Sequence, residues 1–247
     1  MKPGDIIFLS ASVPSREGWR EDARPAEIEE AIVSLARAVF ARGGRLLFGG
    51  HPSISPLISS VAGEYFKPDE ARTVRPVITF QSEFFKGGLP DETWLLYRMG
   101  WSSIEWTGKR PAGGEPDREA SLRWMREWML LGPDLPQEVR MRNELAAPKA
   151  MVAIGGMEGV IDEARMFLEH ARYWDGGERS KIYALASGGG AAARLLFTDD
   201  GELRAAKKGG RIVDLERLWL ERHRGAVRAP FVPYASIVQY MLDNLRG

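Results

Sequence analysis

The chain has 247 residues, in which 34 Lys and Arg residues balance 34 Asp and Glu residues. It contains no cysteine, which excludes disulfides, thiolate zinc sites and cysteine nucleophiles. The balanced charge offers no basic field for nucleic acid, and no apolar run approaches the roughly 18 residues that a membrane span needs. We therefore expect one cytoplasmic domain over residues 1–247 that contacts neither nucleic acid nor a membrane.

Apolar runs alternate with amphipathic stretches along most of the chain. Runs that predict buried parallel strands cover 6–10, 45–48, 76–80, 103–106, 151–154 and 182–185. Apolar residues at helical spacing predict helices near 28–40, 57–62, 93–99, 117–129, 161–171, 191–197, 215–221 and 236–245. Strands that alternate with helices in this way predict an α/β fold, a Rossmann-like parallel sheet with helices on both faces.

Three segments between these elements carry weaker signals. The stretch 109–116 is rich in Gly and Pro and is expected to be irregular, whereas the polar stretch 133–149 is expected to be a helical insertion. The polar segment 198–210 contains two turn signals, so we expect a loop or hairpin there. Helices after it would form a C-terminal extension from about residue 198.

Small residues follow several of the predicted strands. Glycines end three of them, at Gly49-Gly50, Gly155-Gly156 and 188–190, and the first strand ends in Ser10 and Ser12. Ligands of parallel sheets bind at the carboxyl ends of the strands, and glycines let a phosphate approach the backbone closely. The serines also suit an ordinary tight turn. Neither a Walker loop nor the G-x-G-x-x-G fingerprint is present, which argues against kinases, GTPases and classical dehydrogenases.

Two further features have both a structural and a functional interpretation. His51, in the turn after the second strand, either caps that turn or contacts a ligand. The tryptophans in the middle of the chain either pack in the core, which we favour, or form an oligomer interface or stack on a base; they are Trp94, Trp101, Trp106, Trp124 and Trp128. The three histidines, His51, His170 and His223, lie far apart in the sequence, so we expect no metal site.

Three blocks of the sequence together resemble a known family. They are 48–56 (Phe-Gly-Gly-His-Pro-Ser-Ile-Ser-Pro), 118–127, which contains Arg126, and 154–159 (Ile-Gly-Gly-Met-Glu-Gly) followed by Glu163. In order and separation they resemble the SLOG branch of the superfamily that includes the DprA/Smf and LOG proteins, and the resemblance extends to about Phe197. It implies a domain that senses a nucleotide-derived signal, such as an ADP-ribose-like compound or a cyclic nucleotide, in a bacterial antiphage or conflict system.

The LOG enzymes, which are more distant relatives, cleave the N-glycosidic bond of nucleoside monophosphates. Their motif implies that Glu163 occupies the position of a catalytic glutamate and that Arg126 is the best candidate for an upstream catalytic arginine, with Arg142 as a rival. The chain departs from this motif at Ile154, where LOG enzymes have proline, and at Val160, where they have threonine. The missing hydroxyl weakens the hydrolase hypothesis more than it weakens binding.

We therefore favour a ligand-binding module, with a LOG-like hydrolase as the alternative. In the module, Arg126 pairs with a phosphate because its planar fork can bond two oxygens, and Glu163 accepts from ribose hydroxyls. In the hydrolase, Glu163 and Arg126 are catalytic. The candidate ligand-binding residues are Ser10, Ser12, Gly49, Gly50, His51, Ser53, Arg126, Gly155, Gly156, Met157, Glu158, Gly159, Glu163, Ser187, Gly188 and Gly189. No cofactor is expected, and a sensor would act through homo-oligomerisation or a separate effector protein.

Overall fold

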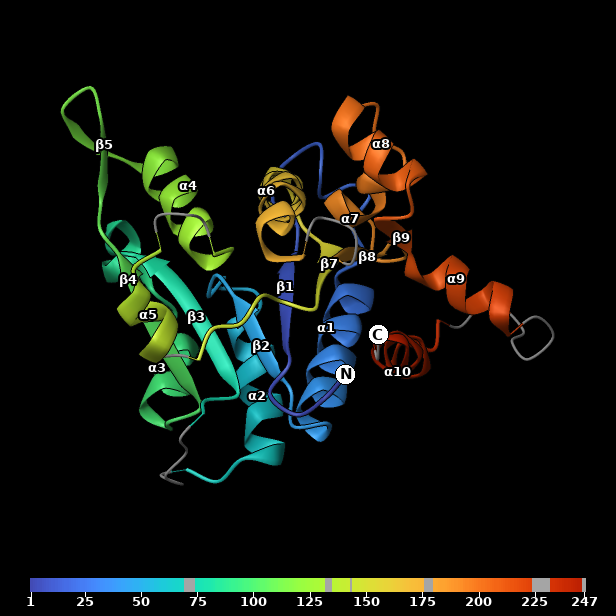
Figure 1. Cartoon of the computed structure of the whole chain (residues 1–247), viewed down its shortest axis with the longest axis horizontal. Coiled ribbons are helices and arrows are strands. Elements are labelled where there is room, and N and C mark those ends of the chain that lie inside the picture. The colour runs from blue at the N-terminus through green and yellow to red at the C-terminus, as the bar shows by residue number, and fades with distance from the viewer. Residues whose placement is uncertain (69–73, 132–134, 143, 176–179, 224–231, 246–247) are drawn as a thin grey trace.

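A seven-stranded parallel sheet forms the centre of the protein, with the strands in the order β4-β3-β2-β1-β7-β8-β9 (Figure 1). The computed structural model describes residues 1–68, 74–131, 135–142, 144–175, 180–223 and 232–245. The strands of the sheet are β1 (Ile6–Ser12), β2 (Arg45–Phe48), β3 (Val77–Ser82), β4 (Ser102–Thr107), β7 (Ala150–Gly155), β8 (Lys181–Leu185) and β9 (Ile212–Asp214). The chain builds from β1 to β4 in one direction and from β7 to β9 in the other, so the strand order reverses between β1 and β7.

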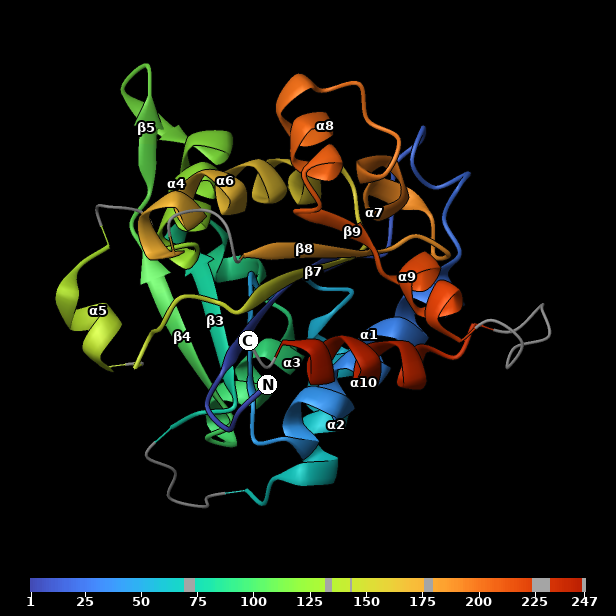
Figure 2. The same cartoon turned by 45° about the vertical axis from the view of Figure 1, so that its right-hand side comes forward.

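Helices cover both faces of this sheet (Figure 2), which confirms the predicted Rossmann-like architecture. One face packs against α1 (Pro25–Ala41), α2 (Ser55–Tyr65), α3 (Asp91–Arg98), α9 (Leu215–Arg222) and α10 (Tyr234–Asn244). The other packs against α4 (Arg118–Met129), α6 (Glu158–Asp175), α7 (Gly190–Leu195) and α8 (Gly201–Lys208), with α5 (Gln137–Arg142) at its border. A 3-10 turn, η1 (Glu83–Gly88), follows β3.

The alternation of side chains along β1 decides which residues can reach the functional site. Ile7 and Leu9 belong to the core beneath α1, whereas Ile6 and Phe8 belong to the core beneath α6. The ring of Phe8 stacks on Phe167 of α6, with 6.3 Å between the ring centres. Because successive side chains of a strand point to opposite faces, Ser10 lies on the same side as Phe8 and points towards α6.

The structure corrects two of the weaker sequence predictions. The segment expected to be irregular contains an antiparallel hairpin, β5 (Arg110–Ala112) and β6 (Glu115–Asp117), and its turn places Gly113 and Gly114 at positive φ. The segment expected to be a loop or hairpin contains α8, because the Asp200 side chain caps the first turn and Leu203 is fully buried. The short strand β9 was not predicted. Part of the expected insertion is helical, as α5, while 132–134 and 143 lie outside the described residues.

Elements after residue 198 share the sheet and its core with the rest of the chain. Strand β9 pairs with β8, where Ile182 lies opposite Ile212. Helix α10 packs along α1, and the Met1 amino group donates a hydrogen bond to the Leu242 carbonyl at 2.7 Å. Within the described residues, no helix has both the length and the apolar character needed to cross a membrane.

The tryptophans in the middle of the chain occupy different environments. Trp101 is a core residue, 6% exposed. Trp94 and Trp106 are partly buried neighbours with ring centres 6.0 Å apart, and Trp124 and Trp128 on α4 are 5.7 Å apart. Core packing therefore accounts for Trp101, and Trp128 also packs against the core beneath α6. The other three are only partly buried. Their part in an oligomer interface or in base stacking remains a prediction.

Candidate functional site

Three side chains from three different elements meet where the strand order reverses. Ser10 at the end of β1 donates a hydrogen bond to Oε2 of Glu163 at 2.5 Å. Arg126 of α4 donates from Nε to Oε1 of the same carboxylate at 3.1 Å. We call Ser10, Arg126, Gly159 and Glu163 the β1–β7 site. Helix α4 follows the β4 side of the sheet and α6 follows β7, so this site joins the two halves of the sheet.

Glu163 is an acid on the buried stripe of its helix. Val160, Ala164 and Phe167 of α6 are buried against the sheet, and Glu163 lies between them at helical spacing. Its side chain is 14% exposed. Burial raises the pKa of the Glu163 carboxyl above its ordinary value, although the Arg126 charge and the Ser10 hydrogen bond act in the opposite direction. A carboxyl group held in this way is suited to binding or to proton transfer at this edge of the sheet.

The guanidinium of Arg126 is bonded to Glu163 through Nε, which leaves its two terminal nitrogens, Nη1 and Nη2, for other partners. Its Nε bonds Glu163, and Nη1 lies 3.7 Å from Asp162. A methyl group added at Gly159 would lie 2.4 Å from Nη2, so the absent side chain lets the guanidinium reach the first turn of α6. Neither Nη atom makes a hydrogen bond within the described part of the chain. Arg142, the rival in the sequence comparison, instead pairs with Glu105 on the edge strand β4.

Most of the predicted phosphate-binding glycines are in contact with protein atoms. A methyl group at Gly155 or Gly188 would lie 2.6 or 2.7 Å from side-chain atoms of Ile28, and one at Gly189 would lie 1.9 Å from the Asp22 carbonyl oxygen. The Gly156 amide already donates to the Ser12 carbonyl at 2.7 Å. The small size of these glycines therefore serves internal packing. The amides of Met157, Glu158 and Gly159 belong to the start of α6, where a helix leaves its N–H groups without helical partners.

Side chains of the loop 13–24 bond to the start of α6. Arg16 forms an ion pair with Glu158, and the Trp19 indole donates to Oε1 of the same carboxylate at 2.9 Å. The guanidinium of Arg194, on α7, lies over the Trp19 ring, 3.8 Å from its centre. Met157 joins this cluster through its sulfur, 3.4 Å from Nε of Arg16. The Glu158 carboxylate is therefore already bonded to Arg16 and Trp19 within the protein. Trp19 is a neighbour of the site that the sequence did not single out.

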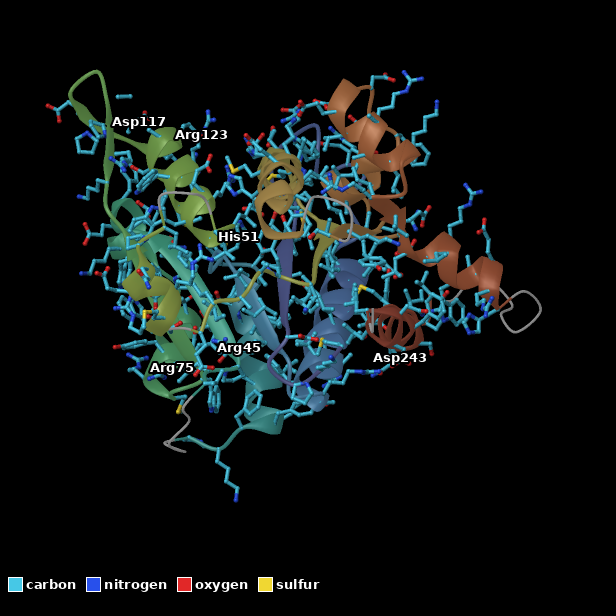
Figure 3. All side chains as sticks on the ribbon, in the orientation of Figure 1. Arg45, His51, Arg75, Asp117, Arg123 and Asp243 are labelled. Atoms are coloured by element: carbon cyan, nitrogen blue, oxygen red, sulfur yellow. The ribbon has the colours of Figure 1, made fainter. Side chains whose placement is uncertain are left out.

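The turn between β2 and α2 is organised by its own polar groups. The imidazole of His51 lies 2.8 Å from the Ser53 hydroxyl, which accepts from the Val13 amide at 3.1 Å. In the view of Figure 3, His51 lies between α4 and α6. Gln81, which the sequence did not single out, donates to the Gly49 carbonyl at 2.7 Å. The only sequence signal for Gln81 is a polar amide at the end of an apolar strand.

Gly49 lies beside α4, the helix that carries Arg126, whereas Gly50 shapes the turn after β2. A methyl group at Gly49 would lie 3.5 Å from Met125, the residue before Arg126. Gly50 has a φ of +64°, and a methyl group there would lie 2.9 Å from Thr79. Glycine is therefore required at position 50 for the turn itself, and Gly49 borders α4.

Ser187 lies in a separate polar cluster at the end of β8. Its amide and hydroxyl donate to Glu216 on α9, with the amide 3.1 Å from each carboxylate oxygen. Its hydroxyl also contacts the Tyr234 hydroxyl, which donates to Glu27 at 2.7 Å. Burial raises the pKa of the Glu216 carboxyl and that of the Tyr234 hydroxyl. The sequence did not select Glu27, Glu216 or Tyr234, because each becomes a neighbour of Ser187 only through the fold.

The histidines contact protein groups in separate places. His170 contacts the Glu127 carboxylate at 2.9 Å and the Leu130 carbonyl at 3.1 Å, and His223 stacks on Trp219 with ring centres 4.5 Å apart. Among the residues that the structure describes, no group of three or more His, Cys, Asp or Glu side chains is arranged to hold a metal ion.

Comparison with known proteins identifies the family. A structural genomics target named TM1055 is 12% identical over 78% of this chain and 81% of that chain, with a TM-score of 0.46. The molybdenum cofactor carrier protein of Chlamydomonas reinhardtii is 13% identical over 99% of this chain and 98% of that chain, with a TM-score of 0.45. Comparison with curated proteins finds no match. The model of the SLOG cluster3 family matches residues 18–217. The chain therefore belongs to the SLOG cluster3 family.

Proposed function

We propose that the protein binds a nucleotide-derived small molecule at the β1–β7 site. The observation that carries the proposal is the position of Arg126, which bonds Glu163 through Nε while its Nη2 lies against Gly159 at the start of α6. A phosphate there would accept from the two terminal nitrogens and from the first-turn amides of α6, whose dipole favours an anion. Ribose hydroxyls would donate to Glu163, because a carboxylate has acceptor capacity beyond the bonds from Ser10 and Arg126.

Membership of the SLOG cluster3 family supports a sensing role. The ligand class that we propose is an ADP-ribose-like compound or a cyclic nucleotide, detected in the cytoplasm as part of a bacterial antiphage or conflict system. The signal would pass to a second copy of the chain or to a separate effector protein. We propose one ligand-binding domain, without a resident cofactor, to which the elements after residue 198 contribute a strand and core side chains.

The alternative is a hydrolase that cleaves the N-glycosidic bond of a nucleotide. The raised pKa of the Glu163 carboxyl favours it, because burial makes this group a better general acid than an exposed glutamate. Val160 argues against it. A methyl group added at Gly156 would lie 2.2 Å from Cγ2 of Val160, so a methyl group is packed on the glycine turn where LOG enzymes have threonine. Binding without hydrolysis therefore agrees better with the side chains of the site.

The test is to incubate the protein with AMP, NAD and ADP-ribose isomers and to measure both the thermal shift and the release of free base. We expect stabilisation without base release, and we expect Glu163→Gln and Arg126→Gln to abolish the stabilisation. Arg123→Gln is the matched control, because Arg123 lies on the same helix and its side chain is 76% exposed. Base release that disappears in Glu163→Gln would support the hydrolase. If none of these compounds causes stabilisation or base release, the nucleotide proposal is refuted.

A further inference from the structure

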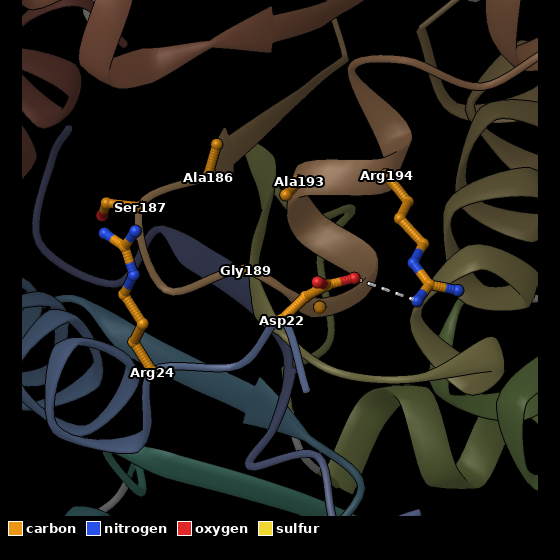
Figure 4. A pocket seen from close by; sticks show the side chains of 8 residues that line it. Asp22, Arg24, Ala186, Ser187, Gly189, Ala193 and Arg194 are labelled. Atoms are coloured by element: carbon orange, nitrogen blue, oxygen red, sulfur yellow. Dashed lines mark ion pairs between the residues drawn. The ribbon is translucent and has the colours of Figure 1, made fainter. Parts of the chain in front are cut away.

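A pocket of about 300 Å³ opens between the loop 13–24 and the turn from β8 to α7 (Figure 4). Its apolar lining is made of small residues, Ala186, Gly189 and Ala193, and its polar lining consists of Asp22, Arg24, Ser187 and Arg194. A volume of this size is at the lower end of the range for small-molecule sites. The pocket can therefore take one polar group of a ligand together with a small part of its scaffold.

The two arginines that line the pocket differ in what they contact. Arg194 lies 3.5 Å from the Asp22 carboxylate and is stacked on Trp19. Arg24 is exposed and forms no ion pair within the described residues, and Figure 4 shows its side chain directed towards Ser187. Its planar fork of donors therefore faces the pocket without an anionic partner.

The acidic groups behind Ser187 are engaged by other donors. Glu216 accepts from the Ser187 amide and hydroxyl, and Glu27 accepts from Tyr234. Ser187 and Tyr234 each donate their hydroxyl proton to one of these carboxyl groups. Glu216 and Glu27 are therefore bonded within this cluster, and neither forms an ion pair with Arg24 among the described residues. This leaves Arg24 available for a ligand.

The pocket contacts the β7–α6 turn, which leads into the β1–β7 site. Gly190, which lines the pocket, is packed on the β7–α6 turn, since a methyl group there would lie 2.7 Å from the Gly156 carbonyl oxygen. The loop 13–24 borders both places, because Trp19 bonds the start of α6 and Arg24 lines the pocket. Ends of neighbouring strands are about 5 Å apart in a sheet, so one small molecule can reach from β7 to β8.

We propose that this pocket is a second oxyanion subsite, in which Arg24 binds a phosphate group of the same ligand that occupies the β1–β7 site. This inference rests on the proposed function where it assigns one ligand to both places. It narrows the ligand class to nucleotide derivatives that carry more than one phosphate group, such as ADP-ribose, in preference to nucleoside monophosphates. Arg24 would bind two phosphate oxygens through its fork.

The first test compares AMP with ADP-ribose by titration calorimetry of the full chain. We expect Arg24→Gln to weaken ADP-ribose binding by about tenfold or more, since a hydrogen bond to a charged group is worth about 1.5–3 kcal/mol, and to leave AMP binding within about twofold. Arg20→Gln is the matched control, because Arg20 lies in the same loop, its side chain is 68% exposed and it does not line the pocket. This control should change neither affinity.

The outcomes separate this inference from the proposed function. If Glu163→Gln weakens ADP-ribose binding and Arg24→Gln does not, the second subsite is wrong and the β1–β7 site stands. If neither nucleotide binds the unmodified protein, the proposed function fails, and inorganic phosphate then tests the pocket alone. Phosphate should shift the amide resonances of Ser187 and Gly189 in the unmodified protein but not in Arg24→Gln. Shifts that are absent, or equal in both proteins, would overturn the subsite.

Discussion

Ser10→Ala provides a direct test of the hydrogen bond that positions Glu163. Ser10 is 1% exposed, and its hydroxyl donates to the Glu163 carboxylate at 2.5 Å. The substitution removes one oxygen and creates little cavity, so its cost is essentially that of the lost bond. A bond to a charged acceptor contributes about 1.5–3 kcal/mol, so we expect the free energy of unfolding to fall by that amount. Urea denaturation followed by circular dichroism measures this loss.

A double-mutant cycle identifies the partner of Ser10. In the Glu163→Gln background the acceptor is uncharged, so the cost of Ser10→Ala should fall to about 0.5–1.5 kcal/mol. Ser59→Ala is the matched control, because Ser59 is also buried, at 7% exposed, but lies on α2. It should change the stability by about 0.5 kcal/mol or less. A cost of Ser10→Ala that equals that of Ser59→Ala, or that is the same with and without Glu163, would refute the reasoning.

Three further predictions concern the surroundings of the same site. Gly159→Ala should displace the Arg126 guanidinium and weaken ADP-ribose binding at least tenfold in calorimetry, while the helix itself gains up to about 1 kcal/mol; unchanged affinity would contradict the proposed contact. The folded-state pKa of Glu163 is raised, so the stability that Glu163 provides relative to Glu163→Gln should be largest below its unfolded-state pKa. This difference in the free energy of unfolding should decline as the pH rises through the folded-state pKa. Urea titrations of both proteins from pH 4 to 8 measure it, and a constant difference would contradict the prediction. Trp19→Phe keeps an aromatic ring but removes the bond to Glu158, so limited proteolysis within the loop 13–24 should be faster than in the unmodified protein, and an equal rate would show that the bond does not hold the loop.

Six of the seven strands of the sheet were predictable because both faces of the sheet are buried, which leaves continuous apolar runs in the sequence. Helix α8 was not predictable from the sequence, because it is polar and Leu203 is its one buried residue in the described structure. A single buried position cannot establish a helical period. Its start could have been recognised from Asp200, whose side chain accepts from the amides of Glu202 and Leu203 at 3.1 and 3.0 Å.

Glu163 was singled out in the sequence because it lies one turn into the helix predicted after the glycine pair 155–156 and occupies the position of the LOG-like glutamate. The structure brings Ser10 and Arg126 into contact with it. What the sequence could not indicate is which atoms fill the space that a glycine leaves. Ile28 is far from Gly155 and Gly188 along the chain, and only the packing of α1 on the sheet brings it against both.

The position of Ile28 between two glycines constrains how the protein can change. A side chain gained at Gly188 would lie 2.7 Å from Cγ1 of Ile28, so it can be accommodated only if residue 28 becomes smaller. Gly188→Ala should therefore be poorly tolerated alone and rescued by Ile28→Ala. Gly155 cannot exchange volume in the same way, because its φ of +58° and the nearby Ser12 carbonyl also exclude a side chain. Substitutions at residues 28 and 188 can therefore compensate for each other in volume, whereas position 155 has to remain glycine.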